Sequence, residues 1–275
     1  MTPLFKAVHT RYVQESKPAR LKTRRRRHRV IALCICMLCG MGLVGGLGAV
    51  SHLEKFAINN VSVSGAKQIS SESIITAVKT ALRENGFHLF SKRNMFLYPK
   101  STIESDLAAD FPRIQQVSVG RSSLLASAVV VTVKERAAYA TWCDTHEKCY
   151  ALDYTGFIYA ESGDSPKTAY VFRGGLLPST DVIGQTFLRG RLAGIITILN
   201  ALKSAGFTPK GLSVDSEKDF SIPLENGPRI LASFDMQPTD IVHNLQTALE
   251  ADGVKTKFGA LQYIDLRFGN RVYYK

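Results

Sequence analysis

An uninterrupted apolar stretch near the N-terminus constrains this chain more than any other feature of its sequence. Residues 30–50 read VIALCICMLCGMGLVGGLGAV and contain no charge, amide or proline. At about 1.5 Å per residue, a helix of this length is roughly 31 Å long, which matches the hydrocarbon thickness of a bilayer. The sequence therefore predicts a transmembrane helix over residues 30–50.

Positive charge is concentrated just before this stretch. Residues 1–29 hold ten lysines and arginines against one acid, Glu15, whereas the rest of the chain holds 25 bases and 22 acids. The net charge of +12 therefore belongs mostly to a basic tail. The positive-inside rule places residues 1–29 in the cytoplasm and the remainder of the chain beyond the membrane. The tail has no sustained apolar period, and we expect it to be mobile.

A cleaved signal peptide is the alternative interpretation of this region. Signal peptides usually carry an apolar region of about 7–15 residues and a much shorter basic region. The sequence therefore favours an uncleaved, single-pass anchor. The arginine run at residues 24–27 would also suit anionic lipids or nucleic acid, but its place against the span favours a topology signal, and no nucleic-acid partner is expected.

Small residues inside the span leave open whether a second transmembrane helix packs against it. Gly42 and Gly46 satisfy G-x-x-x-G, a spacing that lets a second helix approach closely, although glycines are common in such spans. Cys34, Cys36 and Cys39 are most simply small apolar side chains of the same helix.

Beyond the span, the hydrophobic pattern changes in the order strand, helix, helix, strand, strand. Residues 74, 77, 78, 81 and 82 share one face of the first helix, and Ile103 and Leu107 share one face of the second. This order predicts a three-stranded sheet covered on one side by two helices. The expected elements are 58–64, 70–85, 99–110, 114–120 and 129–134.

Residues 137–275 contain more strands than helices. Turn signals such as 153–156 separate short apolar runs, which predicts a mostly antiparallel β domain with two helices and an α+β fold class overall. The expected helices are 186–205 and 238–252. The expected strands are 138–142, 149–153, 157–161, 169–173, 211–215, 220–224, 229–234, 262–268 and 271–275.

Four stretches resemble the FtsQ/DivIB cell-division family. FAINNVSVSG at 56–65 is similar to the first strand of that family's POTRA domain, and VTVKER at 131–136 to the junction with its β domain. CYALD at 149–153 resembles the next hairpin, and YIDLRF at 263–268 the end of the family's β domain. The chain departs from the family at 121–125, where RSSLL replaces an aromatic-proline turn.

The resemblance implies a function without catalysis. Proteins of this family are bitopic scaffolds of the bacterial divisome, enriched at the division septum, which link the septal cell-wall synthesis machinery to FtsB/FtsL-like partners. It also implies a basic cytoplasmic tail (1–29), a span (30–50), a POTRA domain (56–134) that recruits partners near the membrane, and a β domain (137–275). The alternative is that the POTRA domain is only a spacer.

The residues themselves show no catalytic motif, and we expect no catalytic, cofactor-binding or metal-binding residues and no small-molecule substrate. The six histidines are scattered, without H-E-x-x-H, G-x-S-x-G or a phosphate loop. Asp265 and Arg267 share a strand face, which favours an ion pair or a partner contact over acid–base work. The alternative functions are a membrane-anchored envelope enzyme with an unrecognised site and a POTRA-type chaperone.

Cys143 and Cys149 are the remaining chemical feature. Outside the cytoplasm two thiols this close in sequence favour a disulfide that closes a hairpin. Free thiols remain an alternative, and so does a zinc site with His146, although a fourth ligand is missing.

The last two predicted strands carry the candidate partner-binding residues. Alternation places Ile264, Leu266 and Phe268 toward the core and turns the residues between them away from it. A terminal strand is readily an edge strand, and the resemblance implies that an FtsB-like partner adds to it. Alternatively, this strand only closes the sheet. The candidate contact residues are Tyr263, Asp265, Arg267, Arg271, Val272, Tyr273 and Tyr274.

Overall fold

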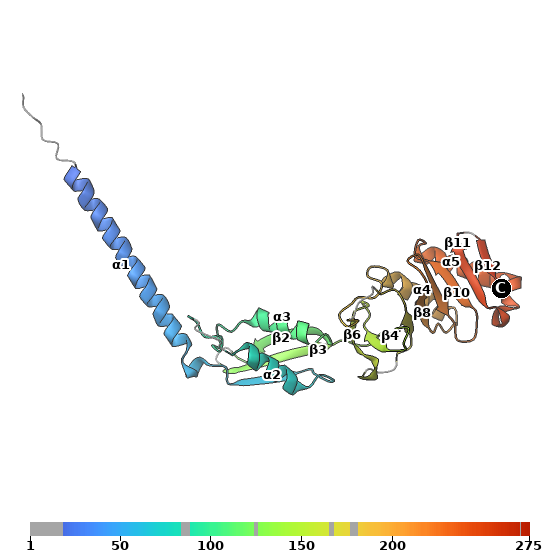
Figure 1. Cartoon of the computed structure of the whole chain (residues 1–275), viewed down its shortest axis with the longest axis horizontal. Coiled ribbons are helices and arrows are strands. Elements are labelled where there is room, and N and C mark those ends of the chain that lie inside the picture. Colours follow the sequence, from blue (N-terminus) through green and yellow to red (C-terminus); the bar gives the residue numbers. More distant parts are fainter. Residues whose placement is uncertain (1–18, 84–88, 124–125, 165–167, 177–180, 270) are drawn as a thin grey trace, which may run out of the picture. The chain divides into compact units, whose positions relative to one another are not determined.

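The computed structural model describes residues 19–83, 89–123, 126–164, 168–176, 181–269 and 271–275, with side chains from residue 26 onward. Figure 1 shows the chain coloured by sequence. Its described residues fall into two units, one drawn from Met1–Asn59 with Leu82–Pro99, and the other from Asn60–Ala81 with Lys100–Lys275.

The first unit is dominated by α1 (Ala19–Ser51). Its portion Arg26–Ser51 is long and apolar enough to cross a bilayer, and indicates single-pass membrane anchoring. The expectation of a mobile tail was wrong for residues 19–29, because α1 already begins at Ala19 and includes the arginine run, whereas residues 1–18 lie outside the described residues. Arginine is a good helix former, and adding a residue to an existing helix is far easier than starting one. The short helix η1 (Glu54–Phe56) follows.

The second unit begins with the small sheet, whose strands lie in the order β1-β3-β2. These are β1 (Asn60–Ser64), β2 (Ile114–Arg121) and β3 (Ala128–Glu135). β1 runs parallel to β3, and β2 runs antiparallel to it. Two helices pack on the sheet through buried side chains that include Ile74, Val78, Ile103 and Leu107 (Figure 1). They are α2 (Ser71–Ala81) and α3 (Lys100–Asp110).

Two boundaries in this region differ from the expectation by more than one residue. β1 begins at Asn60 rather than residue 58, because the N–H of Ile58 donates to the carbonyl of Arg93 instead of to β3. α2 ends at Ala81, and Leu82 is buried in the turn that follows. The predicted helix end at residue 85 and the tip of the 121–128 hairpin lie outside the described residues.

A nine-stranded sheet forms the remainder of the described second unit, in the order β12-β11-β10-β9-β8-β7-β4-β5-β6. Five neighbouring pairs are antiparallel, and β4–β7, β7–β8 and β10–β11 are parallel. The α+β class is therefore confirmed. The strands are β4 (Ala140–Cys143), β5 (Cys149–Leu152), β6 (Ile158–Glu161), β7 (Val171–Arg173), β8 (Gly211–Val214), β9 (Asp219–Pro223), β10 (Arg229–Ser233), β11 (Tyr263–Phe268) and β12 (Arg271–Tyr274).

The core of this domain forms between the sheet and its two main helices, α4 (Leu192–Ser204) and α5 (Pro238–Glu250). α4 starts six residues later than expected, because Thr186 forms a bridge with Phe157 and Gly190 adopts a φ of +78° that a helix does not use. Three short helices were not predicted, namely η2 (Ser162–Asp164), α6 (Asp252–Lys255) and η3 (Phe258–Ala260).

Candidate partner-binding site

The C-terminal strand β12 lies at one end of the sheet order and pairs only with β11 among the described strands (Figure 1). Tyr263 and Lys275 exchange backbone hydrogen bonds of 3.3 and 3.5 Å. Because hydrogen-bonded and non-hydrogen-bonded pairs alternate in an antiparallel ladder, the N–H and C=O of Tyr274 point away from β11. Those of Tyr273, which is opposite Asp265, point toward β11. Tyr274 therefore offers its backbone at the open edge.

Phe268 does not lie where alternation places it. The pairing of β11 with β12 shifts register between Asp265 and Phe268, and Phe268 is 55% exposed, whereas Ile264 and Leu266 are fully buried as expected. A one-residue shift moves the side chains that follow it to the opposite face of a sheet. The Phe268 ring accordingly meets the ring of Tyr273 edge-on, with centroids 5.2 Å apart.

Asp265 lies on the face away from the core, but it is not accessible to a partner. The residue is only 5% exposed, and Arg267 covers it with a two-point contact, from Nε to Oδ1 at 2.9 Å and from Nη2 to Oδ2 at 2.6 Å. Burial raises the pKa of the Asp265 carboxyl, but the hydrogen bonds from Arg267 outweigh it and lower the pKa overall. Arg267 also donates from Nη1 to Asp219 at 3.2 Å. The ion pair between Asp265 and Arg267 was predicted from the sequence. The burial of Asp265 does not support its predicted direct contact with a partner.

The remaining candidate residues differ in accessibility. Tyr273 and Tyr274 are 49% and 47% exposed, Arg271 is exposed, and Val272 packs partly against the core. The exposure of Phe268 was not predicted, because nothing in the alternating sequence of β11 marks the register shift. We call the surface formed by Phe268, Arg271, Tyr273 and Tyr274 the C-terminal edge.

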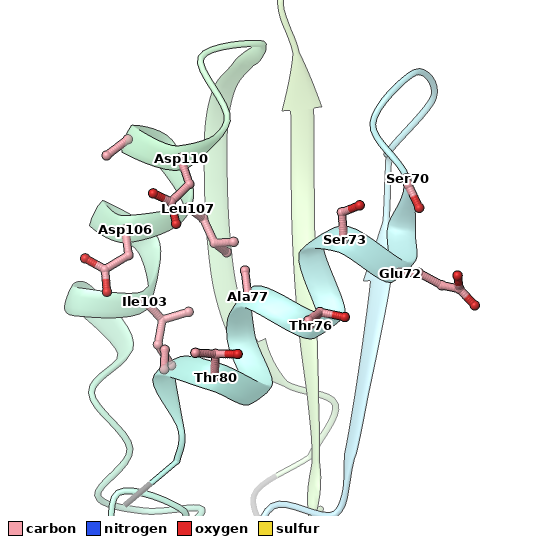
Figure 2. A pocket seen from close by; sticks show the side chains of 12 residues that line it. Ser70, Glu72, Ser73, Thr76, Ala77, Thr80, Ile103, Asp106, Leu107 and Asp110 are labelled. Atoms are coloured by element: carbon pink, nitrogen blue, oxygen red, sulfur yellow. The ribbon is translucent and has the colours of Figure 1, made fainter. Parts of the chain in front are cut away.

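A second candidate surface is the groove between α2 and α3, which was not predicted from the sequence. It encloses about 760 Å³, with Ala77, Ile103 and Leu107 among its apolar lining residues. Figure 2 shows Ile103 and Leu107 pointing from α3 toward α2. Three acidic residues, Glu72, Asp106 and Asp110, are also among the lining residues of the groove.

The edges of the small sheet are not equally open. The carboxylate of Glu104 on α3 accepts a 2.7 Å hydrogen bond from the backbone N–H of Val119 on β2. One donor of the β2 edge is therefore occupied by the protein's own side chain. β1, at the other edge of the sheet, is the better candidate for strand addition in this domain.

Cys143 and Cys149 face each other across β4 and β5 and are joined by a disulfide, with Cα atoms 4.1 Å apart. The His146 side chain in the intervening turn is 88% exposed. Within the described residues, no group of three histidine, cysteine or acidic side chains lies close enough together to hold a metal ion.

Comparison with protein families identifies a known domain type in this chain. Residues 56–136 match the model of the POTRA domain, FtsQ-type. This domain type is that of a family of cell-division scaffolds that are generally non-enzymatic. No match was found among curated proteins.

Proposed function

From its FtsQ-type POTRA domain, which is consistent with a protein of the FtsQ/DivIB family, we propose that this chain is a bitopic scaffold of the bacterial divisome without catalytic activity. The basic tail lies in the cytoplasm, α1 crosses the membrane, and the POTRA and β domains lie on the outer side at the division septum. The positive-inside rule supports this orientation, because the arginine run directly precedes the apolar span.

The observation that carries the binding part of the proposal is the open backbone of β12. The N–H and C=O of Tyr274 face away from the sheet, and an extended peptide could pair with them as a further strand. The exposed rings of Phe268 and Tyr273 lie beside this edge, and aromatic residues dominate binding energy at many interfaces. We assign the occupant as the extracytoplasmic segment of an FtsB-like protein, which itself accompanies an FtsL-like partner.

Charge at the same edge adds a constraint on the partner. Arg271 and Lys275 are exposed at the two ends of the terminal strand, and Arg267 is one-third exposed beside them. A partner strand that carries carboxylates next to its pairing residues would associate faster and in a preferred register.

The POTRA domain supplies a separate recruitment function in this proposal. Its acid-lined groove between α2 and α3 and its β1 edge are two surfaces close to the membrane anchor in sequence, because only residues 51–55 separate the predicted span from the domain. Deleting residues 56–134 while keeping the anchor and the β domain should abolish recruitment to the septum. Normal midcell targeting of that variant would show that the domain is a spacer.

Localisation tests the scaffold function as a whole. A fluorescent fusion of the full chain should concentrate at midcell, and depletion of the protein should produce filamentous cells that grow without dividing. Uniform membrane fluorescence together with normal division on depletion would contradict the proposal.

A further inference from the structure

Apolar side chains are exposed where the apolar helix α1 ends. A hollow of about 310 Å³ forms there, lined by the last turns of α1 and by residues of the segment 89–97. Three of its lining side chains and two that lie close to lining residues in sequence are between 40% and 53% exposed, so large apolar side chains face outward here. These side chains belong to Leu53, Leu89, Phe90, Phe96 and Leu97.

Buried polar groups fix the segment 89–97 to α1. The Ser51 hydroxyl donates to the carbonyl of Gly48 at 2.6 Å and accepts from the N–H of Ser91 at 3.0 Å. The Asn94 side-chain amide donates to the carbonyl of Ser51 at 3.0 Å. This bond satisfies one of the carbonyl groups that the end of a helix leaves without an intrahelical partner. Ser51, Ser91 and Asn94 are each at most 6% exposed, so these bonds are shielded from water.

Gly48 allows the two parts to approach closely. A Cβ atom at this position would lie 2.6 Å from the carbonyl oxygen of Leu89, which is too close for any side chain. Gly42 and Gly46, the glycines of the G-x-x-x-G spacing, have no such neighbour among the described residues. The glycine that receives a packing partner in this structure is therefore Gly48, and the partner is a segment of the same chain.

The backbone around Asn94 holds Phe96 and Leu97 outward. The N–H of Met95 donates to the carbonyl of Phe56, and the N–H of Ile58 donates to the carbonyl of Arg93, both at 2.8 Å. The Asn94 Oδ1 atom accepts from the N–H of Phe96 at 2.9 Å. These bonds set a tight turn, so the exposure of the two apolar side chains at its tip is built into the fold.

We propose that the segment 89–97 is a membrane-contact element whose Phe90, Phe96 and Leu97 side chains insert at the boundary between lipid headgroups and acyl chains. The lipid surface is the occupant because the patch continues the apolar surface of α1 at the point where that helix leaves the bilayer. Phenylalanine and leucine are typical of surfaces that bury at the boundary between headgroups and acyl chains, and the exposed Lys55 and Arg93 suit lipid phosphates. This inference rests on the membrane anchoring in the proposed function.

Tryptophan quenching in vesicles tests the depth of the segment. The full chain is reconstituted in phosphatidylcholine vesicles whose acyl chains carry bromine either near the headgroup or near the chain end. Phe96→Trp and Leu97→Trp should be quenched most strongly by the shallow bromine. Leu38→Trp, within the span, should be quenched by the deep bromine and reports anchoring by itself. Tyr154→Trp, in the β domain, is the unquenched control, and the parent supplies the background of its single native tryptophan, Trp142.

The outcomes distinguish the membrane contact of the segment 89–97 from the membrane anchoring by α1. Quenching at residue 96 no greater than at residue 154, with Leu38→Trp still quenched, would overturn the membrane contact and leave the anchor intact. Failure of Leu38→Trp to be quenched would remove the anchor itself. Absence of shallow quenching at residue 96 together with a dimer of the chain in the vesicles would assign the patch to a second copy of the chain and overturn the lipid contact. Adding Asn94→Asp should reduce quenching at residue 96 and leave quenching at residue 38 unchanged.

Discussion

Arg136 and Asp153 connect the POTRA domain to the β domain, with Nη1 of the arginine 2.6 Å from Oδ2 of the aspartate. Arg136 directly follows β3, and its Nε atom also donates to the carbonyl of Pro112 at 3.0 Å. Its guanidinium lies 4.2 Å from the centre of the Phe157 ring. The Asp153 side chain is only 5% exposed, so the ion pair is shielded on the acid side.

Arg136→Ala should therefore destabilise the protein by about 3 kcal/mol, because it leaves a buried carboxylate without its counterion. Urea unfolding of the detergent-solubilised chain, followed by Trp142 fluorescence, measures the loss. Lys210→Ala is the matched control, because its 2.7 Å pair with Glu225 is about half-exposed on both sides and should contribute less than about 1 kcal/mol. Equal losses in the two variants would refute the role assigned to Arg136.

Proline substitutions in β12 should separate partner binding from folding. Tyr274→Pro removes an N–H that points to the open edge, so it should abolish co-purification of the FtsB-like partner while leaving the unfolding midpoint near that of the parent. Tyr273→Pro removes an N–H that points toward β11, so it should also lower the midpoint. Truncation of residues 271–275 should abolish co-purification as well. Retention of the partner by the truncated chain or by Tyr274→Pro would place the interface elsewhere.

Stability should fall at acid pH partly through Glu135. Its carboxylate accepts hydrogen bonds from the N–H groups of Lys67, Gln68 and Ile69 at 2.6 to 3.1 Å. Burial raises its pKa, but these bonds outweigh it and hold the pKa below the ordinary value of 4.5. A lowered pKa contributes stability that is present above pH 4.5 and is lost as the pH falls through the folded-state pKa.

The variant Glu135→Gln tests this dependence. It should be less stable than the parent at neutral pH. The unfolding free energies of the two proteins should converge as the pH falls well below 4.5. The lowered pKa values of Asp153 and Asp265 act in the same direction in both proteins and so cancel in the comparison. A difference in unfolding free energy that stays constant across the acid range would exclude Glu135 as a contributor to the acid sensitivity.

The Cys143–Cys149 disulfide should be present in protein isolated without reductant. Alkylation in denaturant should then add three groups, at the cysteines of α1, instead of five. Because the bond closes a short loop, its loss should cost about 2 kcal/mol of unfolding free energy. Reductant should lower the stability of the parent and leave the double variant Cys143→Ala, Cys149→Ala unchanged. Five adducts would show free thiols.

The sequence by itself determined the features that depend on local pattern. The apolar length of residues 30–50, the helical spacing of Ile103 and Leu107, and the strand-helix-helix-strand-strand order were all predicted and appear in the structure. These features arise from hydrophobic periodicity within one segment, and periodicity is visible without knowing which segments meet. The pairing of Asp265 with Arg267 is local in the same sense, because residues two apart share a strand face.

Only the tertiary structure decided which side chains are accessible. Phe268 is exposed because β11 and β12 shift register, and Asp265 is covered by Arg267, which also binds Asp219, 48 residues before Arg267 in the chain. The contact of Gly48 with Leu89 likewise joins segments that no local pattern connects. Strand register and long-range packing are properties of pairs of segments. The C-terminal edge and the apolar patch at the end of α1 therefore form only when the chain is folded.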